Sequence, residues 1–428
     1  MRIVHIIPGS GGSFYCGNCL RDSKYVPALK DLGHEVVKIP MYLPLFSHDA
    51  SNNGIPVFYG AVSIYLKQLY PIFRNAPSWI DKLLNTGPVL KLAARFAGST
   101  NAAGLEEMTV SMLLGENGQQ KEELERMVDW IEEHYQPDII HLSNALLLGL
   151  AHRIKERLNT TLICSLQDED VWVDVMAPVY RNRVWKLMQD NVQYVDGFIA
   201  VSDFYAARMK EQMMIPNEKL RTVHIGVAPD DYTSLLPSEK KRAVGYISRL
   251  CHDNGLDILV DAFIELKGRQ GFEDVRLIIT GGSTGDDTIY IRDLKNKLVK
   301  SKNSGDVVFH DSFGDEGKKQ FFESVSLISV PVRNGEAFGI YLLESMASGV
   351  PVIQPALGAF PEIINIAGGG LVYEPNQSMP LADMLAEILS EPETLDALSI
   401  AGKSGVSTSF NIHKQALEMV NAYKSFLK

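Results

Sequence analysis

Short apolar runs alternate with helical segments along most of this 428-residue chain, and this alternation constrains the fold more than any other feature. Residues 2–7 are almost all apolar, as expected of a strand buried on both faces. A glycine-rich turn and a helix ending at Gly33 separate them from a second strand. This second strand is expected at residues 34–39, and further strands at residues 137–142, 161–165, 196–201, 220–224, 275–280, 307–310, 326–330, 350–354 and 370–373. Residues 243–250 are expected to form another strand and the loop after it. Strands separated by helices predict an α/β fold with parallel, doubly wound, Rossmann-like sheets.

The chain is too long for one typical hydrophobic core, so we expect two domains. The N-terminal domain would comprise residues 1–235, with an insertion at about 41–120 where the alternation breaks down. The turn-rich segment 226–237 leads into a second domain at residues 236–410, and residues 411–428 are expected to form a final helix.

Composition excludes several classes of function. Apolar residues make up 46% of the chain and charged residues 22%, as in globular proteins, and the formal net charge is −11. An acidic balance argues against nucleic acid as a partner, because neutralising phosphates requires a basic surface. We expect a cytoplasmic protein, because no signal peptide is recognisable and no apolar run approaches the roughly 20 residues needed to span a bilayer.

The stretch from Pro331 to Glu362 carries the chemistry. A turn-rich loop contains Glu336, a helix is expected to begin near Gly339 and contain Glu344, and a strand follows Gly349. The two carboxylates have seven residues between them, which corresponds to about 12 Å along a helix. The free N–H groups of the first helical turn can bind an anion between them. The pattern is typical of a nucleotide-sugar pocket, although an ordinary βαβ unit with solvated acids would also contain two glutamates.

This stretch, with E-x7-E followed by SMASGVPVI and GAFPE, resembles the donor-site signature of the retaining glycosyltransferases of family 4, which have the GT-B fold of two doubly wound domains facing a cleft. The resemblance covers most of the chain except residues 41–120. It implies that Glu336 contacts the transferred sugar and Glu344 the ribose. It also assigns the diphosphate to the backbone around Phe338, Gly339 and Ile340.

The same resemblance assigns roles elsewhere in the chain. Arg249 corresponds to the family's diphosphate-binding arginine, and Asn254 stands where the family usually has a lysine. Gln167 stands where a histidine usually contacts the sugar; it can donate and accept hydrogen bonds but cannot act as a base. Gly11 and Gly12 would face the donor across the cleft, and the final helix would cross back to the first domain.

The glycine-rich turn at residues 8–13 can bring backbone N–H groups close to a phosphate. It lacks the G-x-G-x-x-G pattern, so a nicotinamide cofactor is not expected.

Four cysteines are present, two of them in the motif Cys16-Gly17-Asn18-Cys19. The motif is interpreted as two thiols packed in a tight loop, with a redox or metal role left open. The remaining cysteines, Cys164 and Cys251, are isolated in the sequence.

Asp168 and Asp170 form an Asp-x-Asp motif that could hold a divalent metal. The chain has two complete sets of alternating strands and helices, which favours the interpretation of this motif as a polar loop at a strand end. The predicted reaction needs no metal.

The insertion at residues 55–104 interleaves basic and aromatic residues. The pattern favours helices packed on their own domain, but peripheral contact with the inner face of a membrane, or with a lipid acceptor, is the alternative.

The sequence therefore predicts a retaining glycosyltransferase (hexosyltransferase, EC 2.4 class) without a cofactor. It would transfer a sugar from a UDP- or GDP-sugar to a hydroxyl acceptor, such as a cell-envelope glycan or a lipid-linked glycan. Two alternatives are a non-catalytic nucleotide-sugar-binding protein and a nucleotide-sugar epimerase on the same fold.

Overall fold

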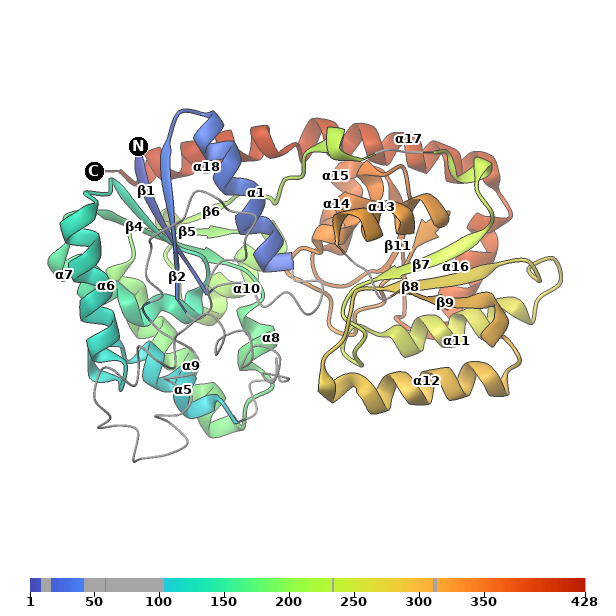
Figure 1. The fold of residues 1–428 in the computed structure, drawn as a ribbon, viewed down its shortest axis with the longest axis horizontal. Helices are drawn as coiled ribbons and strands as arrows, with labels where there is room; N and C mark the ends of the chain where they lie inside the picture. Colours follow the sequence, from blue (N-terminus) through green and yellow to red (C-terminus); the bar gives the residue numbers. More distant parts are fainter. Residues whose placement is uncertain (9–16, 42–57, 59–103, 233–234, 311–313, 428) are drawn as a thin grey trace. The chain divides into compact units, whose positions relative to one another are not determined.

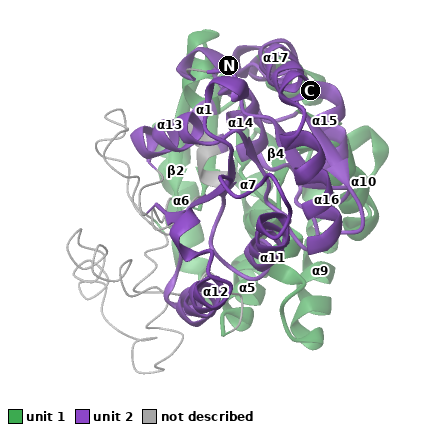
Figure 2. Ribbon diagram, turned by 90° about the vertical axis from the view of Figure 1, so that its right-hand side faces the viewer, with its two compact units in different colours: residues 1–11, 25–223, 417–428 green, residues 12–24, 224–416 purple. Residues whose placement is uncertain are grey.

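The computed structural model describes residues 1–8, 17–41, 58, 104–232, 235–310 and 314–427 (Figure 1). The chain divides into two compact units (Figure 2). Unit 1 contains Met1–Gly11, Tyr25–Val223 and Leu417–Lys428, and unit 2 contains Gly12–Lys24 and His224–Ala416. Gly11, Gly12, Cys16 and nearly all of the predicted membrane-contact segment 55–104 lie outside the described residues.

Unit 1 is built on a six-stranded sheet in the order β2-β1-β3-β4-β5-β6, in which every neighbouring pair is parallel. The strands are β1 (Arg2–Ile7), β2 (Glu35–Pro40), β3 (Ile139–Leu142), β4 (Thr161–Leu166), β5 (Gly197–Ala200) and β6 (Leu220–Thr222). The residues of β3, β4 and β5 are all buried, which explains why these strands are continuous apolar runs in the sequence.

The helices of unit 1 follow the predicted alternation. They are α1 (Gly17–Asp31, which also contributes its first half to unit 2), α5 (Glu106–Leu113), α6 (Lys121–His134), α7 (Ala151–Arg157), α8 (Glu169–Val173), α9 (Pro178–Asn191) and α10 (Asp203–Met213).

One helix is shorter than predicted. The sequence predicts a helix over residues 145–157, but Ala145–Leu150 form the 3-10 segment η4 and α7 begins only at Ala151. A Cβ atom on Gly149 would lie 1.9 Å from the carbonyl oxygen of Met112, so the backbone of η4 lies directly against α5. This close approach favours the tighter 3-10 conformation over an α-helix. The Asn144 side chain, which accepts the N–H of Leu146 at 3.1 Å, favours it as well.

The final helix, α18 (Ile412–Phe426), ends in unit 1. The hydroxyl of Tyr423 lies 2.6 Å from Nδ1 of His141 on β3, and Nε2 of the same ring lies 2.7 Å from Oγ of Ser165 on β4. The ring of His5 on β1 stacks on His141 with centroids 4.6 Å apart. These polar groups are all buried, so a hydrogen-bonded chain joins α18 to the middle of the sheet.

Unit 2 has a second six-stranded parallel sheet, in the order β12-β11-β10-β7-β8-β9. The strands are β7 (Ala243–Ile247), β8 (Arg276–Thr280), β9 (Val307–Phe309), β10 (Leu327–Ile328), β11 (Val352–Pro355) and β12 (Gly370–Tyr373). The helices are α11 (Leu256–Lys267), α12 (Thr288–Lys300), α13 (Asp315–Ser324), α14 (Ile340–Ala347), α15 (Phe360–Ala367), α16 (Ser378–Leu389) and α17 (Pro392–Ser409). Helices α13 to α15 lie on one side of the sheet and α11 and α12 on the other (Figure 1). The predicted doubly wound α/β architecture is therefore confirmed in each unit.

Candidate functional site

The loop before α14 is shaped by glycines. Gly335 and Gly339 have φ angles of +72° and +84°, a region that other residues rarely adopt, and Gly339 is the residue from which α14 begins. The side chain of Glu336 is half-buried, and a Cβ atom on Gly339 would lie 3.3 Å from its Oε2. The Glu336 carboxylate therefore lies beside the start of α14, as the sequence predicts. Phe338 and Ile340 are each 2% exposed, so a ligand here would meet their backbone rather than their side chains.

The loop after β7 holds Arg249 in a fixed orientation. Its Nε donates to Oδ2 of Asp287 at 2.9 Å, and its Nη2 donates to Oδ1 of Asp287 at 3.1 Å and to Oγ1 of Thr284 at 2.8 Å. This two-point contact uses the planar fork of the guanidinium and fixes its plane. The role of Arg249 in binding a diphosphate remains a prediction, but its side chain is held in one place before any ligand arrives.

Asn254 braces the same loop. Its amide donates to Oγ of Ser248 at 2.8 Å and to the carbonyl oxygen of Arg249 at 3.3 Å. A Cβ atom on Gly255 would lie 2.0 Å from the carbonyl oxygen of Pro331, so this loop and the loop that precedes α14 touch backbone to backbone. Asn254 supplies no charge here; it holds the backbone that carries Arg249.

Arg333 lies at the same junction. Its guanidinium donates to the carbonyl oxygen of His252 and forms an ion pair with Asp257 at 2.5 Å. Arg333 thus ties the loop before α14 to the first turn of α11.

Glu344 lies inside α14 and has no exposed surface. Its Oε1 accepts hydrogen bonds from Nζ of Lys318 on α13 at 2.8 Å and from the hydroxyl of Tyr232 at 3.2 Å. Burial, reinforced by the charge of Glu344, raises the pKa of Tyr232 well above its usual range. Burial alone would lower the pKa of Lys318, but the charges of Glu344 and Asp315 outweigh it and raise that pKa. The predicted contact between Glu344 and a ribose stays a prediction; in this structure the carboxylate faces a lysine and a tyrosine.

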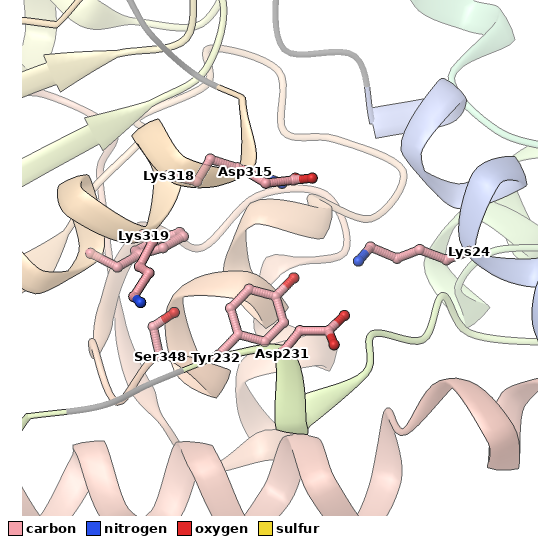
Figure 3. Close-up of a pocket in the computed structure, with 8 residues that line it drawn as sticks. Lys24, Asp231, Tyr232, Asp315, Lys318, Lys319 and Ser348 are labelled. Atoms are coloured by element: carbon pink, nitrogen blue, oxygen red, sulfur yellow. The ribbon is translucent and has the colours of Figure 1, made fainter. Parts of the chain in front are cut away.

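A cavity of about 260 Å³ opens beside this buried pair (Figure 3). It is lined by Lys24, Asp231, Tyr232, Asp315, Lys318, Lys319, Phe322 and Ser348, all of which belong to unit 2. Sequence reasoning missed Lys318 and Tyr232, because no local pattern distinguishes Lys318 from Lys319, its exposed neighbour on the same helix.

In unit 1, the carboxyl end of β4 carries a second cluster. Gln167 is 3% exposed, and its side-chain amide donates to the carbonyl oxygen of Ser143 at 2.7 Å. Glu169 is 1% exposed; its carboxylate accepts the N–H groups of Ala145 and Gln167, each at 2.8 Å, and the hydroxyl of Tyr205 at 2.8 Å. Burial raises the pKa of Glu169 from 4.5 to about 7, although these hydrogen bonds oppose the shift. The predicted sugar contact of Gln167 remains a prediction.

The Asp-x-Asp pair lies at the same strand end. Asp168 has a φ angle of +58°, in the left-handed region that aspartate tolerates better than most residues. Asp170 accepts the hydroxyl of Tyr205 at 2.8 Å and forms an ion pair with Arg208 at 3.0 Å. Asp168 thus precedes α8 and Asp170 lies in its first turn, at the strand end where the sequence predicts a polar loop.

Among the described residues, three potential metal ligands gather on the surface of unit 1. Glu116, His152 and Glu156 bring one ligand atom each to within 4.8 Å of the others. Glu116 already lies 3.0 Å from Nδ1 of His152, and Glu156 forms an ion pair with Arg153 at 2.5 Å. Cys164 is buried on β4 and Cys251 is half-buried after β7, and neither forms a disulfide. In the part of the chain that the structure describes, no helix has the length and apolar character needed to cross a bilayer.

Comparison with known proteins gives matches in both units. Residues 112–231 match the family model described as Glycosyltransferase Family 4, and residues 229–405 match the model described as Glycosyl transferases group 1. The lipopolysaccharide core biosynthesis mannosyltransferase LpsB of Rhizobium meliloti is 29% identical over 195 residues, which cover 44% of this chain and 53% of the relative. Human alpha-1,3/1,6-mannosyltransferase ALG2 is 28% identical over 191 residues, covering 43% of this chain and 45% of ALG2. The chain thus spans about half the length of these curated relatives.

Solved structures match nearly the whole chain. Sucrose-phosphate synthase from Thermosynechococcus elongatus superposes with a TM-score of 0.72 at 17% identity, covering 99% of this chain and 98% of that chain. HepE from Anabaena, solved in complex with UDP, superposes with a TM-score of 0.69 at 16% identity, covering 99% and 100%. With the two six-stranded parallel sheets, these neighbours show that the chain has the GT-B fold expected from the sequence.

Proposed function

We propose that this chain, which has the GT-B fold and matches glycosyltransferase family models in both of its units, is a glycosyltransferase that uses a nucleoside diphosphate sugar. The observation that carries the proposal is the junction at Gly339. There a half-buried carboxylate, Glu336, lies beside the first N–H groups of α14, within the residues that match the group 1 family model. The relatives named above are mannosyltransferases, which supports sugar transfer as the reaction class.

Unit 2 would hold the donor. The reaction must stabilise a departing diphosphate and a sugar that develops oxocarbenium character. The N–H groups at the start of α14 and the fixed guanidinium of Arg249 provide donors for the diphosphate oxygens, so its negative charge is offset without a metal. Glu336 would accept hydrogen bonds from the sugar hydroxyls.

We further propose that transfer proceeds with retention at the anomeric carbon. In such a reaction the leaving phosphate oxygen can take the proton of the acceptor hydroxyl, so no protein base is required to remove that proton. Gln167 would then serve by hydrogen bonding alone. In this structure its side-chain amide donates to the carbonyl oxygen of Ser143, which fixes the orientation of the side chain.

The donor would be a UDP- or GDP-sugar and the acceptor a hydroxyl of a glycan or lipid-linked glycan, with cell-envelope glycan synthesis as the setting. The relatives support this class, since LpsB is named for lipopolysaccharide core biosynthesis and the HepE structures contain UDP and UDP-glucose. We place the reaction on the cytoplasmic side, where nucleotide sugars are made.

Thermal unfolding in the presence of UDP-, GDP- and ADP-sugars tests donor binding, because a ligand of the folded state must raise Tm. Nucleotide release is then measured with each stabilising donor and candidate acceptors, with the Glu336→Gln variant as the comparison. A donor that raises Tm and is consumed only with an acceptor supports the transferase. Stabilisation without nucleotide release would favour a nucleotide-sugar-binding protein. Conversion of the donor in the absence of any acceptor would favour an epimerase. If no nucleotide sugar raises Tm, the donor assignment is contradicted.

A further inference from the structure

The buried pair of Lys318 and Glu344 determines what a ligand in the unit 2 cavity can touch. Glu344 has no exposed surface and is not among the residues that line the cavity, whereas Lys318 and Tyr232 both line it. The side chain of Lys318 is 8% exposed, and its Nζ lies 2.8 Å from Oε1 of Glu344. A molecule that enters the cavity therefore meets the ammonium group of Lys318 and the phenol of Tyr232 (Figure 3), and both of these groups are bonded to the Glu344 carboxylate.

Lys318 also has a second, weaker anionic partner at the cavity. Oδ1 of Asp315 lies 3.6 Å from Nζ, and the Asp315 side chain is fully exposed to solvent. An ammonium group has three N–H donors, and an exposed ion pair at this distance contributes little. An anionic oxygen of a ligand can replace Asp315 at Lys318 without disturbing the bond to Glu344.

Two further ammonium groups can contact an anion in the cavity. Lys24 and Lys319 line the same space, with Asp231 and Asp315 as the opposing charges. Nζ of Lys24 lies 5.9 Å from the centre of the Tyr232 ring. Because the cavity is partly removed from solvent, these ammonium groups act on a ligand through less screening than they would on an open surface.

We propose that Lys318 is the residue of this cavity that binds an anionic oxygen of the ligand, and that Glu344 and Tyr232 position it from behind. The inference rests on the proposed function, in which the nucleoside diphosphate portion of the donor supplies that oxygen. It changes the role of Glu344 from a group that contacts the ligand to a positioning residue that acts through Lys318.

Binding of UDP, GDP and pyrophosphate to the full chain, measured by calorimetry, tests the inference, with uridine and guanosine as uncharged probes. Lys318→Met should weaken the diphosphates at least tenfold and leave the nucleosides unchanged. Lys300→Met is the matched control, because it removes an exposed lysine of unit 2 that does not line the cavity; it should change affinity less than threefold. Since Lys318→Met leaves Glu344 buried without its cation, the double variant Lys318→Met/Glu344→Gln is measured beside it and should show the same loss.

Three results would overturn the inference: no diphosphate binding by the wild type, wild-type affinity in the folded double variant, or an equal loss in Lys300→Met. Sugar transfer by the wild type is measured separately, so that the two proposals can fail independently. A wild type that binds diphosphates through Lys318 but transfers no sugar contradicts only the proposed function. If the wild type transfers sugar and the Lys318→Met variant binds UDP with wild-type affinity, only the inference is contradicted.

Discussion

Replacing Glu169 by glutamine should change how the stability of unit 1 depends on pH. The carboxyl group is 1% exposed, and burial raises its pKa from 4.5 to about 7 in the folded protein. A carboxyl group with a raised pKa binds more protons in the folded than in the unfolded state between these two values. The free energy of unfolding therefore falls as the pH rises from about 4.5 to 7, and the contribution is largest at acid pH.

The size of this effect follows from the two pKa values. Each pH unit of difference corresponds to about 1.4 kcal/mol, so the full effect is roughly 3 kcal/mol, of which about 2.5 kcal/mol falls between pH 5 and pH 8. Because glutamine does not titrate, the difference in stability between the wild type and Glu169→Gln should shift by about that amount in favour of the variant. For a unit of this size it corresponds to a relative change in Tm of roughly 5–10 °C.

Calorimetric melts of both proteins at about pH 5, 6, 7 and 8 measure this difference, and other titrating groups cancel because they are common to both. Asp170→Asn is the matched control: Asp170 accepts the same Tyr205 hydroxyl but is only half-buried. If the stability difference between the wild type and Glu169→Gln is constant across this range, Glu169 is ionised throughout and the reasoning from burial is wrong. If Asp170→Asn shows the same pH dependence, the Tyr205 hydrogen bond rather than burial of Glu169 is its source.

Three further predictions concern single contacts. Gly339→Ala should lower the free energy of unfolding of unit 2 by about 1–2 kcal/mol in urea titrations, because alanine is strained at a φ of +84°. The control is Gly285→Ala, which should change this free energy by less than about 1 kcal/mol, because a Cβ atom there meets nothing within 4 Å. Tyr423→Phe should destabilise unit 1 by about 1–3 kcal/mol in calorimetric melts, because it removes a buried partner from His141; an unchanged Tm would show that this bond is dispensable. Arg249→Lys should weaken UDP binding at least tenfold, since an ammonium group lacks the planar fork; equal calorimetric affinity would remove Arg249 from the diphosphate site.

Local patterns in the sequence were sufficient for the fold and for the loop before α14. The positions of β7 and β11 follow from their apolar runs, and the beginning of α14 follows from Gly339, because a glycine before an apolar helical run indicates a backbone turn. The position of the Glu336 side chain beside Gly339 is local as well, because the two residues are three positions apart in the chain. Such features are predictable because their causes lie within a few residues.

Contacts between distant segments were not predictable in the same way. Lys318 and Glu344 are 26 residues apart on different helices, and the partner of Gln167 is the backbone of Ser143 on the preceding strand's loop. The family resemblance assigns Asn254 to the donor site, but it does not predict that the Asn254 amide holds the loop that carries Arg249. In each case the side chain's partner depends on how helices and loops pack, which composition and periodicity do not determine.

The division of the chain has a consequence for its biosynthesis. Residues 417–428 belong to unit 1, so this unit lacks a helix until residues 224–416 have been translated. Residues 224–411 precede α18 in the chain, which allows most of unit 2 to fold before Tyr423 can contact His141. A nascent chain that is stalled or cleaved before residue 412 would therefore have all six strands of the N-terminal sheet but lack the helix that contacts His141, and would expose buried residues of the sheet to chaperones and proteases.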